Sequence, residues 1–546
     1  MVALFSHKGL LGDHLSGTSL QTGVCITAAS AFLLFGYDQG IMSGIITEPN
    51  FLDWFPQMDP ENKSGAIQAL VVAIYEVGCL VGSGFIVYAG DILGRRKAVL
   101  IGTSIMLVGT ALQATAWTMG HLIVGRIVTG IGNGMNTSSI PVWQSEMAPP
   151  KIRGFLVLFE GALISGGIMI SYWINYGFWF VTNHGSFQWR FPIAFQSLFG
   201  ICLIIGVLLY PESPRWLIKK GKSDAAIATM AVLEEKSEDD PTLLADIEEM
   251  KRINAITMEK LTPKELFSNG EEMNLWRLTV ACLSQAFQQL GGLNLVTYYA
   301  TTVFEDSLQF DAELSRLMTG CLGTEFFIAA LVALFVVDRL GRRKLMLWGA
   351  VGMGTCLLII GACLSKTTTT YKAPAYAATV FIFVYNTCFA IGWLGVTWLY
   401  PAEVTPIRIR AEANGFSTCS NWLINYGVVQ LAPIMINKIS WKTYFVFMCF
   451  NYMHVPIVFW FFPETNGYKL EAMDAIFERA HERGENPVWA ERKIRKGKEG
   501  LDLSGHENGR DEEEPVGGLR GMEEEKKEVR NDLNGDEEKE DISDGR

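Results

Sequence analysis

An aspartate stands in the middle of an apolar segment near the start of the chain. The segment at residues 29–46 reads ASAFLLFGYDQGIMSGII, and Asp38 is its one charged residue. A charge at the centre of a membrane-spanning helix costs at least about 2.5–3.5 kcal/mol on insertion scales, so such residues usually face a cavity and have a partner. The expected partner is Arg126, in the glycine-rich run GRIVTGIGNG, where helices can approach closely.

This pair has the properties that a proton carrier needs. Arg126 favours the ionised carboxyl of Asp38, whereas removal from water favours the protonated form, so protonation can depend on which side is open to water. A fixed ion pair that braces the amino-terminal half is the alternative. Replacement of Asp38 by Asn separates the two, because it abolishes uphill accumulation only where the carboxyl carries protons.

A second polar group lies in QQLGGLNLVTYY, at residues 288–299. Gln288 and Gln289 are adjacent amides, Asn294 follows one and a half turns later, and Tyr298 lies one turn beyond. Buried amides both donate and accept hydrogen bonds, which suits the hydroxyl groups of a substrate. The two glycines allow the helix to open locally. We predict a substrate site here; a polar clamp between helices is the alternative.

Three further carboxylates, Glu76, Glu160 and Glu325, lie in other apolar segments. Each is a candidate for moving protons or binding hydroxyls, or for pairing within a helix contact, and Glu160 is slightly favoured.

The elements that position these residues are membrane spans. Of the 546 residues, 49% are hydrophobic and 19% are charged, whereas a soluble protein carries about 25% charged residues. A segment of about 20 apolar residues crosses a bilayer. We predict twelve such spans, at residues 23–46, 66–88, 98–117, 121–143, 154–177, 190–210, 276–301, 315–337, 344–364, 374–400, 411–436 and 441–462.

The two halves of the chain repeat each other. GDILGRRK at 90–97 returns as VDRLGRRK at 337–344, SEMAPPKIRG at 145–154 as AEVTPIRIRA at 402–411, and PESPRW at 211–216 as PETNGY at 463–468. Similar offsets indicate a duplicated six-span unit, the architecture of secondary transporters with a midplane substrate site. The predicted parts are an amino-terminal segment 1–22, halves at 23–210 and 274–462, a helical connection 211–273 and a tail 463–546.

Charge sets the predicted orientation. The loops that contain GRRK, KIRG, IKKGK and IRIR are basic and alternate with loops of little basic excess, which places both termini and the connection in the cytoplasm. Asn62 heads a sequon in the first outer loop, a weak glycosylation candidate. Residues 501–546 hold seventeen acidic and seven basic residues, and we predict a disordered acidic tail after about residue 485.

In order and spacing, the motifs GDILGRR, GRIVTGIGNG, PVWQSEMAPPKIRG, PESPRW, QQLGGLNLVTYY, DRLGRRK and PETNGYKLEAMD resemble the sugar-porter family of the major facilitator superfamily over residues 20–475. The segments 153–177 and 416–436 are most similar to fungal STL-type proteins, which include proton-coupled glycerol symporters and sugar permeases. The resemblance implies an all-α fold of twelve transmembrane helices in two pseudo-symmetric halves.

The resemblance also implies roles for particular residues. Asp38 and Arg126 match the proton-coupling pair, and Trp398 and Asn425 join Gln288, Gln289, Asn294 and Tyr298 in the pocket. Cytoplasmic charge networks join Arg95 with Glu146 and Arg153, and Arg342 with Glu403 and Arg410. They either latch the outward-facing state or only set the topology of the chain. The chain departs from the family at three pocket positions, where amide or polar residues are replaced by Gly161, Phe326 and Ala390.

The sequence therefore predicts a proton symporter that imports a monosaccharide or small polyol across the plasma membrane, working as a monomer. A hexose facilitator without proton coupling and a non-transporting sugar sensor are the alternatives. We find no nucleotide-binding loop, catalytic triad or metal-spaced cluster in the sequence, so we expect no enzyme activity, cofactor or metal, and no nucleic-acid partner.

Overall fold

Helices make up the regular structure in the part of the chain that the computed structural model describes. These residues are 15–59, 65–148, 153–182, 185–257, 263–367, 372–468 and 470–497. Asn62, the side chain of Arg153 and the tail beyond residue 497 lie outside the described part, so the predictions made for them stay predictions. The disorder predicted after about residue 485 is wrong for residues 487–495, which form a helix, because Asn486 caps its start and Trp489 packs on Phe459 and Trp460.

The first six spans form an amino-terminal half, which we call the N-half. The sixth span is divided at Gln196 into two helices. The spans are α1 (Gly17–Ile45), α3 (Ala66–Leu93), α4 (Arg95–Ala114), α5 (Met119–Met147), α6 (Arg153–Trp179), and α7 (Phe187–Phe195) with α8 (Ser197–Leu209).

The last six spans form the C-half, in which two spans are interrupted. The seventh breaks at two glycines and the tenth passes through the π-helix η7 (Ala390–Leu394). The spans are α13 (Asn274–Leu290) with α14 (Leu293–Tyr298) and α15 (Ala300–Thr302), α16 (Ala312–Leu340), α17 (Arg342–Leu364), α18 (Ala373–Phe389) with α19 (Val396–Val404), α20 (Arg410–Ile439), and α21 (Lys442–Phe461).

Nine of these spans, judged on the described residues, are long and apolar enough to cross a membrane by themselves. The other three are α5, the broken span α13–α15, and α20, which are the spans that carry Arg126, the amides of residues 288–294, and Asn425. Polar side chains lower their hydropathy because they line the interior of the protein. The twelve predicted spans are confirmed, and their ends differ from the predicted ends by at most six residues.

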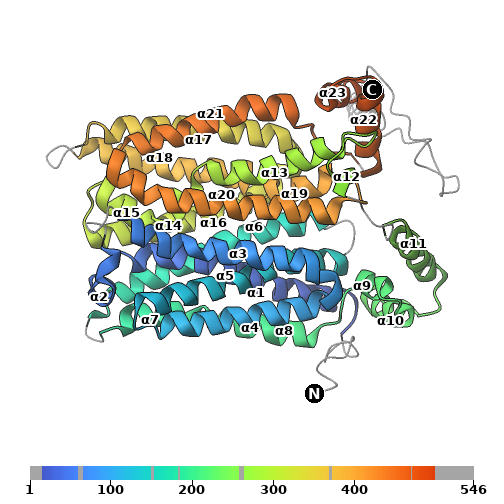
Figure 1. Cartoon of the computed structure of the whole chain (residues 1–546), viewed down its shortest axis with the longest axis horizontal. Coiled ribbons are helices and arrows are strands. Elements are labelled where there is room, and N and C mark those ends of the chain that lie inside the picture. The colour runs from blue at the N-terminus through green and yellow to red at the C-terminus, as the bar shows by residue number, and fades with distance from the viewer. Residues whose placement is uncertain are drawn as a thin grey trace, which may run out of the picture. The chain divides into compact units, whose positions relative to one another are not determined.

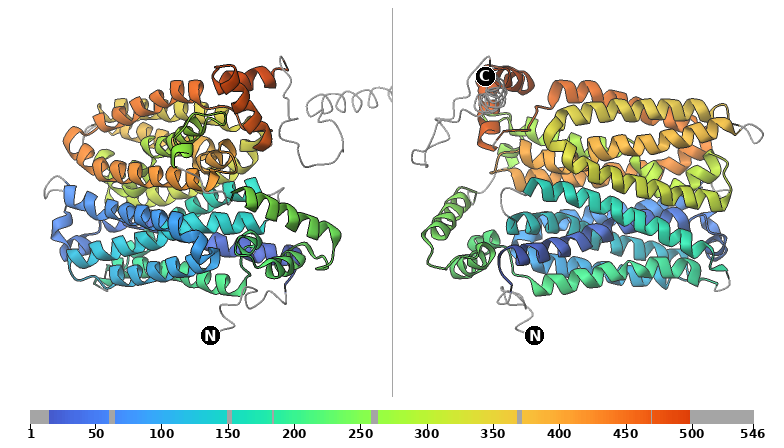
Figure 2. Two further views of the ribbon diagram at one scale, coloured as in Figure 1. Left: turned by 45° about the vertical axis from the view of Figure 1, so that its right-hand side comes forward. Right: turned by 180° about the vertical axis from the view of Figure 1, so that it is seen from behind.

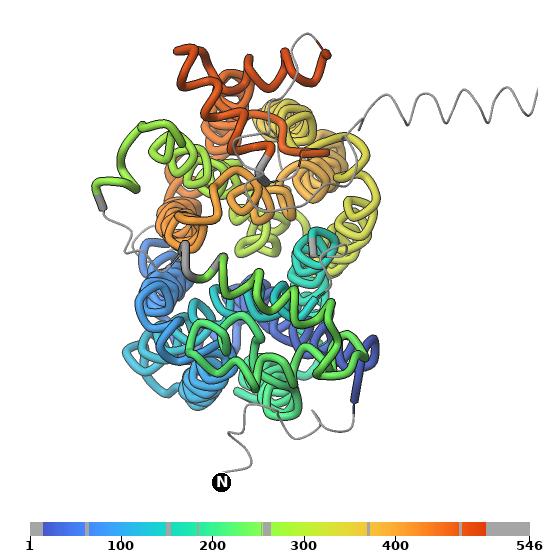
Figure 3. The backbone as a smooth tube through the Cα atoms, turned by 90° about the vertical axis from the view of Figure 1, so that its right-hand side faces the viewer, coloured from blue at the N-terminus to red at the C-terminus, as the bar shows by residue number. Residues whose placement is uncertain are grey.

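The two halves meet along two main seams. α6 packs against α16, and α3 packs against α20, as the views from front and back show (Figures 1 and 2). Seen end-on, the helices of each half form a group of their own (Figure 3). Residues of α1 also contact α14 and α15.

The two ends of the bundle differ in their short helices. One end, which we call the α2 end, carries α2 (Pro49–Trp54), the 3₁₀ turn η2 (Pro56–Met58) and the π-helix η6 (Val303–Ser307). The other, the α9 end, carries helices of the 211–273 connection and of the chain's end (Figure 1). These are α9 (Pro214–Lys219), α10 (Ser223–Glu234), α11 (Pro241–Thr257), α12 (Pro263–Leu266), α22 (Leu470–Glu482) and α23 (Pro487–Arg495).

Candidate functional site

Asp38 and Arg126 meet in the interior of the N-half. Nη1 of Arg126 donates to Oδ1 of Asp38 at 3.3 Å, and neither side chain is exposed. Nη2 of Arg126 donates to the carbonyl of Val72 at 3.1 Å, and the guanidinium carbon lies 4.6 Å from the centre of the Tyr75 ring. Oδ2 of Asp38 and Nε of Arg126 have no hydrogen-bond partner. The side chain of Tyr75 lies beside both members of the pair. One oxygen of Asp38 bonds Arg126, and the other is where a proton can bind.

Glycines bring α3 and α5 close enough to form this site. A Cβ atom on Gly130 would lie 2.2 Å from the carbonyl oxygen of Tyr75, and one on Gly134 would lie 2.1 Å from that of Cys79. Only residues without side chains permit this approach. Gly130 follows Arg126 by one helical turn, so the same contact that joins the two helices sets the reach of the guanidinium to α3.

The predicted amides form a chain of hydrogen bonds between α13–α14 and α20. Nδ2 of Asn294 donates to Oε1 of Gln289 at 2.5 Å and also to Oδ1 of Asn425. Nε2 of Gln289 donates to Oε1 of Gln288 at 3.3 Å and to Oδ1 of Asn421 at 3.1 Å. All are buried. Hydroxyl groups of a substrate can replace these bonds one for one, because each amide both donates and accepts.

The sequence analysis did not identify two further amides of this hydrogen-bonded group, Gln285 and Asn421. Asn421 donates from Nδ2 to Oε1 of Gln285 at 2.6 Å and to Oε1 of Gln288 at 3.0 Å. Gln285 precedes Gln289 by four residues, and Asn421 precedes Asn425 by four. Residues four apart share a helix face, so this spacing was the available sign. We call Gln285, Gln288, Gln289, Asn294, Asn421 and Asn425 the amide cluster.

The break in the seventh span positions the cluster. Gly292 has a φ of 95°, which side chains rarely tolerate, and α14 begins immediately after it. The carbonyl of Gly291 accepts hydrogen bonds from the Tyr385 hydroxyl and from Nδ2 of Asn451, each at 2.9 Å. These bonds satisfy the carbonyl that the break leaves free and fix the direction in which Asn294 points.

The two tryptophans of the tenth span differ in burial. Trp393 is fully buried and donates from Nε1 to the carbonyl of Met346 at 3.1 Å, so it is a packing residue. Trp398, which the resemblance placed in the pocket, is only partly buried on α19. Its role as an apolar wall for a substrate stays a prediction.

Apolar packing occupies the three positions where the chain departs from the family. A Cβ on Gly161 would lie 3.5 Å from Cα of Gly395, so α6 and α19 cross there with little space between them. The rings of Phe326 and Phe389 lie 6.2 Å apart between centres, next to the buried Ala390. The missing polar groups are thus replaced by a close helix crossing and an aromatic wall.

The three extra carboxylates occupy different surroundings. Glu76 accepts a hydrogen bond on Oε1 from the Tyr298 hydroxyl at 2.5 Å, across the seam between the halves. Glu325 accepts from the Thr387 hydroxyl at 2.5 Å within the C-half. Glu160 is buried, and its Oε1 has no hydrogen-bond partner. Only Glu76 among the three lies beside both the ion pair and the amide cluster.

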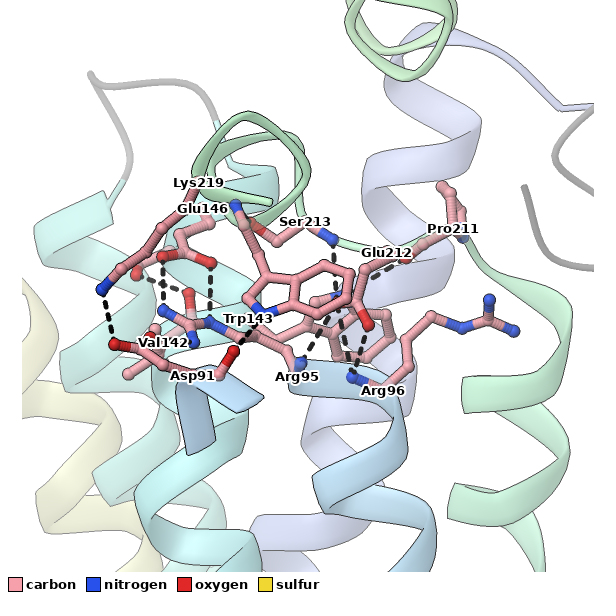
Figure 4. Close-up of polar contacts among 12 residues, drawn as sticks. Asp91, Arg95, Arg96, Val142, Trp143, Glu146, Pro211, Glu212, Ser213 and Lys219 are labelled. Atoms are coloured by element: carbon pink, nitrogen blue, oxygen red, sulfur yellow. Dashed lines mark hydrogen bonds and ion pairs between the residues drawn. The ribbon is translucent and has the colours of Figure 1, made fainter. Parts of the chain in front are cut away.

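A charge network closes the α9 end of the N-half (Figure 4). Nε and Nη2 of Arg95 donate to the two carboxylate oxygens of Glu146, each at 3.2 Å. The carboxylate of Glu212 accepts from the backbone N–H groups of Arg95, Arg96 and Ser213 at 3.0–3.2 Å, at the start of α4. A helix start favours negative charge there. Burial still raises the pKa of Glu212 above its ordinary value, against these N–H groups.

The C-half repeats this network. Nε and Nη2 of Arg342 donate to the carboxylate of Glu403 at 3.2 and 3.0 Å, and the N–H of Arg342 donates to Glu464 at 2.8 Å. Arg410 donates to the carbonyl of Thr405 at 3.0 Å. Arg342 and Glu403 therefore lie together, as Arg95 and Glu146 do.

Glu212 and Glu464 are the acidic residues that the network adds to the predicted set. They stand at matching places in PESPRW and PETNGY, which the sequence analysis used only as marks of the repeat. Both glutamates stand directly after the last span of their half. This shared position was the sign that each could cap the start of the third span of its own half, α4 or α17.

An arginine joins the two halves at the α2 end. Nη1 of Arg316 donates to Oε1 of Glu305 at 2.6 Å within the C-half. Nη2 of Arg316 donates to the hydroxyl of Thr47 at 2.7 Å, and its guanidinium carbon lies 3.7 Å from the centre of the Trp179 ring; both partners belong to the N-half. We call these four residues the Arg316 clamp. No pattern in the sequence pointed to it.

Other bonds support the clamp. The N–H of Thr301 donates to the hydroxyl of Ser43 at 3.2 Å, which joins α15 to α1. Glu48 lies fully buried next to the clamp with neither carboxyl oxygen hydrogen-bonded. Burial raises the pKa of Glu48 to about 8, although the charge of Arg316 lowers it. The α2 end is thus closed by bonds between the halves.

Comparisons with known proteins agree with this architecture. The family model described as "Sugar (and other) transporter" matches residues 24–477. "Sugar transporter STL1" of Saccharomyces cerevisiae is 38% identical over 491 residues, covering 88% of this chain and 84% of that protein. "Major facilitator superfamily transporter mfsA" of Aspergillus fumigatus is 36% identical over 486 residues, covering 87% of this chain and 89% of that protein.

A solved structure gives the same result. The structure of the proton:xylose symporter XylE bound to 6-bromo-6-deoxy-D-glucose is similar with a TM-score of 0.72 and 26% identity, covering 84% of this chain and all of that chain. The family model and the relatives are named as transporters, and the solved structure is that of a symporter; none is an enzyme. The chain belongs to the sugar transporter family of the major facilitator superfamily.

Proposed function

We propose that this transporter imports a monosaccharide or small polyol together with a proton across the plasma membrane, by alternating access. The observation that carries the proposal is the fully buried Asp38–Arg126 pair, in which only Oδ1 of Asp38 bonds the guanidinium and Oδ2 has no hydrogen-bond partner. The named relatives include a sugar transporter and, among solved structures, a proton:xylose symporter.

The pair supplies a proton site whose occupancy depends on the state of the carrier. Arg126 favours the ionised form of Asp38 and burial favours the protonated form, and a proton delivered from water neutralises the carboxyl and weakens the ion pair. The carrier then reorients, and the proton leaves when the other side opens. Because transport and protonation favour the same conformational change, the proton gradient drives accumulation.

The membrane orientation follows from the basic loops. The α9 end carries GRRK before both α4 and α17, and we place it in the cytoplasm with both termini. The α2 end, with the Arg316 clamp, then faces outward. The charge networks of Arg95 and Arg342 lie on the cytoplasmic side, each within its own half. The carrier works as a monomer, with one substrate path between its own two halves.

The amide cluster supports a substrate rich in hydroxyl groups, because it offers six amides in one buried group. The close crossing at Gly161 and the aromatic wall of Phe326 remove polar contacts that a pyranose ring would use. A site with fewer polar contacts favours a smaller substrate, and glycerol and pentoses are the candidates ahead of glucose.

Yeast cells without their own sugar and glycerol carriers provide the test. In weakly buffered medium, glycerol, xylose and glucose are added in turn, and labelled uptake is recorded with external pH. Transient alkalinisation together with uptake of one compound supports symport and identifies the substrate. Uptake without a pH change, with equal concentrations inside and outside, would show a facilitator instead.

Two variants complete this test. Asp38→Asn is expected to retain exchange of labelled substrate across the membrane and to lose accumulation. Asp53→Asn, which removes an exposed carboxylate in α2, is expected to accumulate as the wild type does. Undiminished accumulation by Asp38→Asn would overturn the role of the pair.

A further inference from the structure

Glu76 connects the ion pair to the substrate site. It lies on α3 with no exposed surface, and its Oε1 accepts the hydroxyl hydrogen of Tyr298, on α14 of the other half, at 2.5 Å. Oε2 has no hydrogen-bond partner. The side chain of Asn425, a member of the amide cluster, lies beside the Glu76 carboxyl and interacts with it. A carboxyl of the N-half thus contacts the pocket of the C-half.

Arg126, on α5, contacts α3 close to Glu76. The guanidinium of Arg126 donates to the carbonyl of Val72, four residues before Glu76, and packs on the ring of Tyr75. Glu76 interacts electrostatically with both Arg126 and Asp38. One guanidinium therefore serves two carboxyl groups, and it is hydrogen-bonded to one of them in this structure.

Charge balance makes the two carboxyls interdependent. The titratable groups that face Glu76 are Asp38 on α1, Arg126 on α5, Tyr298 on α14, and its neighbours Tyr75 and Cys79 on α3. With both carboxyls ionised, this buried group would carry a net negative charge. With both protonated, Arg126 would be left as an unpaired buried cation, which is also costly. The group is neutral when one of the two carboxyls holds a proton.

We propose that Glu76 is a second proton-handling residue, which takes over Arg126 when Asp38 is protonated. A proton from outside binds Oδ2 of Asp38, the guanidinium moves its hydrogen bond from Asp38 to Glu76, and the proton held by Glu76 leaves to water on the cytoplasmic side. The proton on Asp38 then passes to Glu76, which restores the starting state with one proton moved inward. The net charge stays constant through the exchange. Since Glu76 also holds Tyr298, this exchange links the proton to the seam between the halves and to the pocket. The inference rests on the proposed symport.

Glu76→Gln tests the carboxyl without removing the contact. The amide oxygen can still accept from Tyr298, but it can neither carry a proton nor neutralise Arg126. We expect exchange of labelled substrate to remain close to the wild type, and accumulation to be lost. Tyr298→Phe is the matched variant, since it keeps the carboxyl and removes the bond. Because Tyr298 belongs to the predicted pocket, we expect a raised KM for substrate, whereas accumulation at saturating substrate persists because the proton-handling carboxyl is still present.

The readouts separate failure of this inference from failure of symport. Cell-surface abundance and exchange at equal pH establish that each variant is folded and binds substrate. If the wild type accumulates, Asp38→Asn does not and Glu76→Gln does, the role of Glu76 is refuted while symport stands. If the wild type itself does not accumulate, the proposed function fails first. Loss of exchange in Glu76→Gln would show a substrate-binding or structural role and would also overturn the proposal.

Discussion

Removal of the Arg316 clamp is expected to open the α2 end. In Arg316→Gln, the shorter amide cannot keep both the Thr47 hydroxyl and the face of Trp179, which lie on the opposite half. A hydrogen bond to a charged group contributes about 1.5–3 kcal/mol, and a cation over an aromatic ring contributes about 0.5–2 kcal/mol. The two contacts that cross the seam thus stabilise the closed state by about 2 kcal/mol or more. Each 1.4 kcal/mol is a factor of ten, so the closed-to-open ratio should fall at least about 30-fold.

Labelling of a cysteine in the seam measures this change. Ser43→Cys places a thiol where α1 meets Thr301, buried in the closed state. An impermeant thiol reagent added outside should react at least about 30-fold faster when Arg316→Gln is combined with it. Protein without the added cysteine gives the background from the ten native cysteines, all of which are free.

Arg190 provides the matched control. It also lies at the α2 end, stacks on tryptophan rings and donates to the carbonyls of Ala114 and Ala116 at 2.7 and 2.8 Å. All these partners belong to the N-half. Arg190→Gln should therefore lower thermal stability without changing the labelling rate. Equal labelling rates in the two variants would refute the assignment of Arg316 to the gate.

Three other perturbations follow from the structure. Glu403→Gln removes the carboxylate that holds Arg342 within the C-half; faster labelling from the cytoplasmic side would show that the network latches one state, and unchanged access, the result expected for contacts confined to one half, would mean that these charges only set topology. Glu48 has a pKa of about 8 in the closed state, against an ordinary value near 4.5 for a glutamate in water. Between pH 8 and 4.5, Glu48 is therefore protonated in the closed state and ionised when exposed to water, so lowering the pH in this range favours the closed state. Lowering external pH from 8 to 5 slows Ser43→Cys labelling in any case, because less of the thiol is thiolate. It should slow labelling more in the protein with Glu48 than in Glu48→Gln, and equal slowing in the two would exclude Glu48. Gly130→Ala puts a Cβ atom 2.2 Å from a carbonyl oxygen of α3 and should destabilise by about 1–3 kcal/mol, whereas Gly84→Ala, with nothing within 4 Å, should not; the melting temperatures in detergent compare them.

The sequence predicted the spans well because their length is set by the thickness of the bilayer. The repeated motifs also predicted two halves, and the residues at matching places, such as Arg95 and Arg342, do form matching networks. These features depend on local composition or on order along the chain, which a single sequence contains.

The contacts between distant spans could not be predicted in this way. Arg316 reaches Thr47 across 269 positions of sequence, and Glu76 reaches Tyr298 across 222. Such pairs depend on how the helices cross, and the hydropathy of a sequence carries no information about helix crossing. Asn421 is the intermediate case, because its spacing from Asn425 could have revealed it, but its bond to Gln285 depends on the crossing of α13 and α20.

The glycine contact between α3 and α5 has a mechanical consequence. Gly78 and Gly82 of α3 and Gly130 and Gly134 of α5 would each place a Cβ atom within 2.1–2.4 Å of a backbone oxygen on the facing helix. Backbone presses on backbone, with no side chain between to rotate or bend. At the α6–α16 seam, by contrast, Gly320 faces the ring of Trp173. The N-half is therefore expected to move as a rigid body, and the seams, where side chains can rotate, are where the halves move against each other. Binding of a proton or substrate should then turn one half relative to the other rather than deform the N-half.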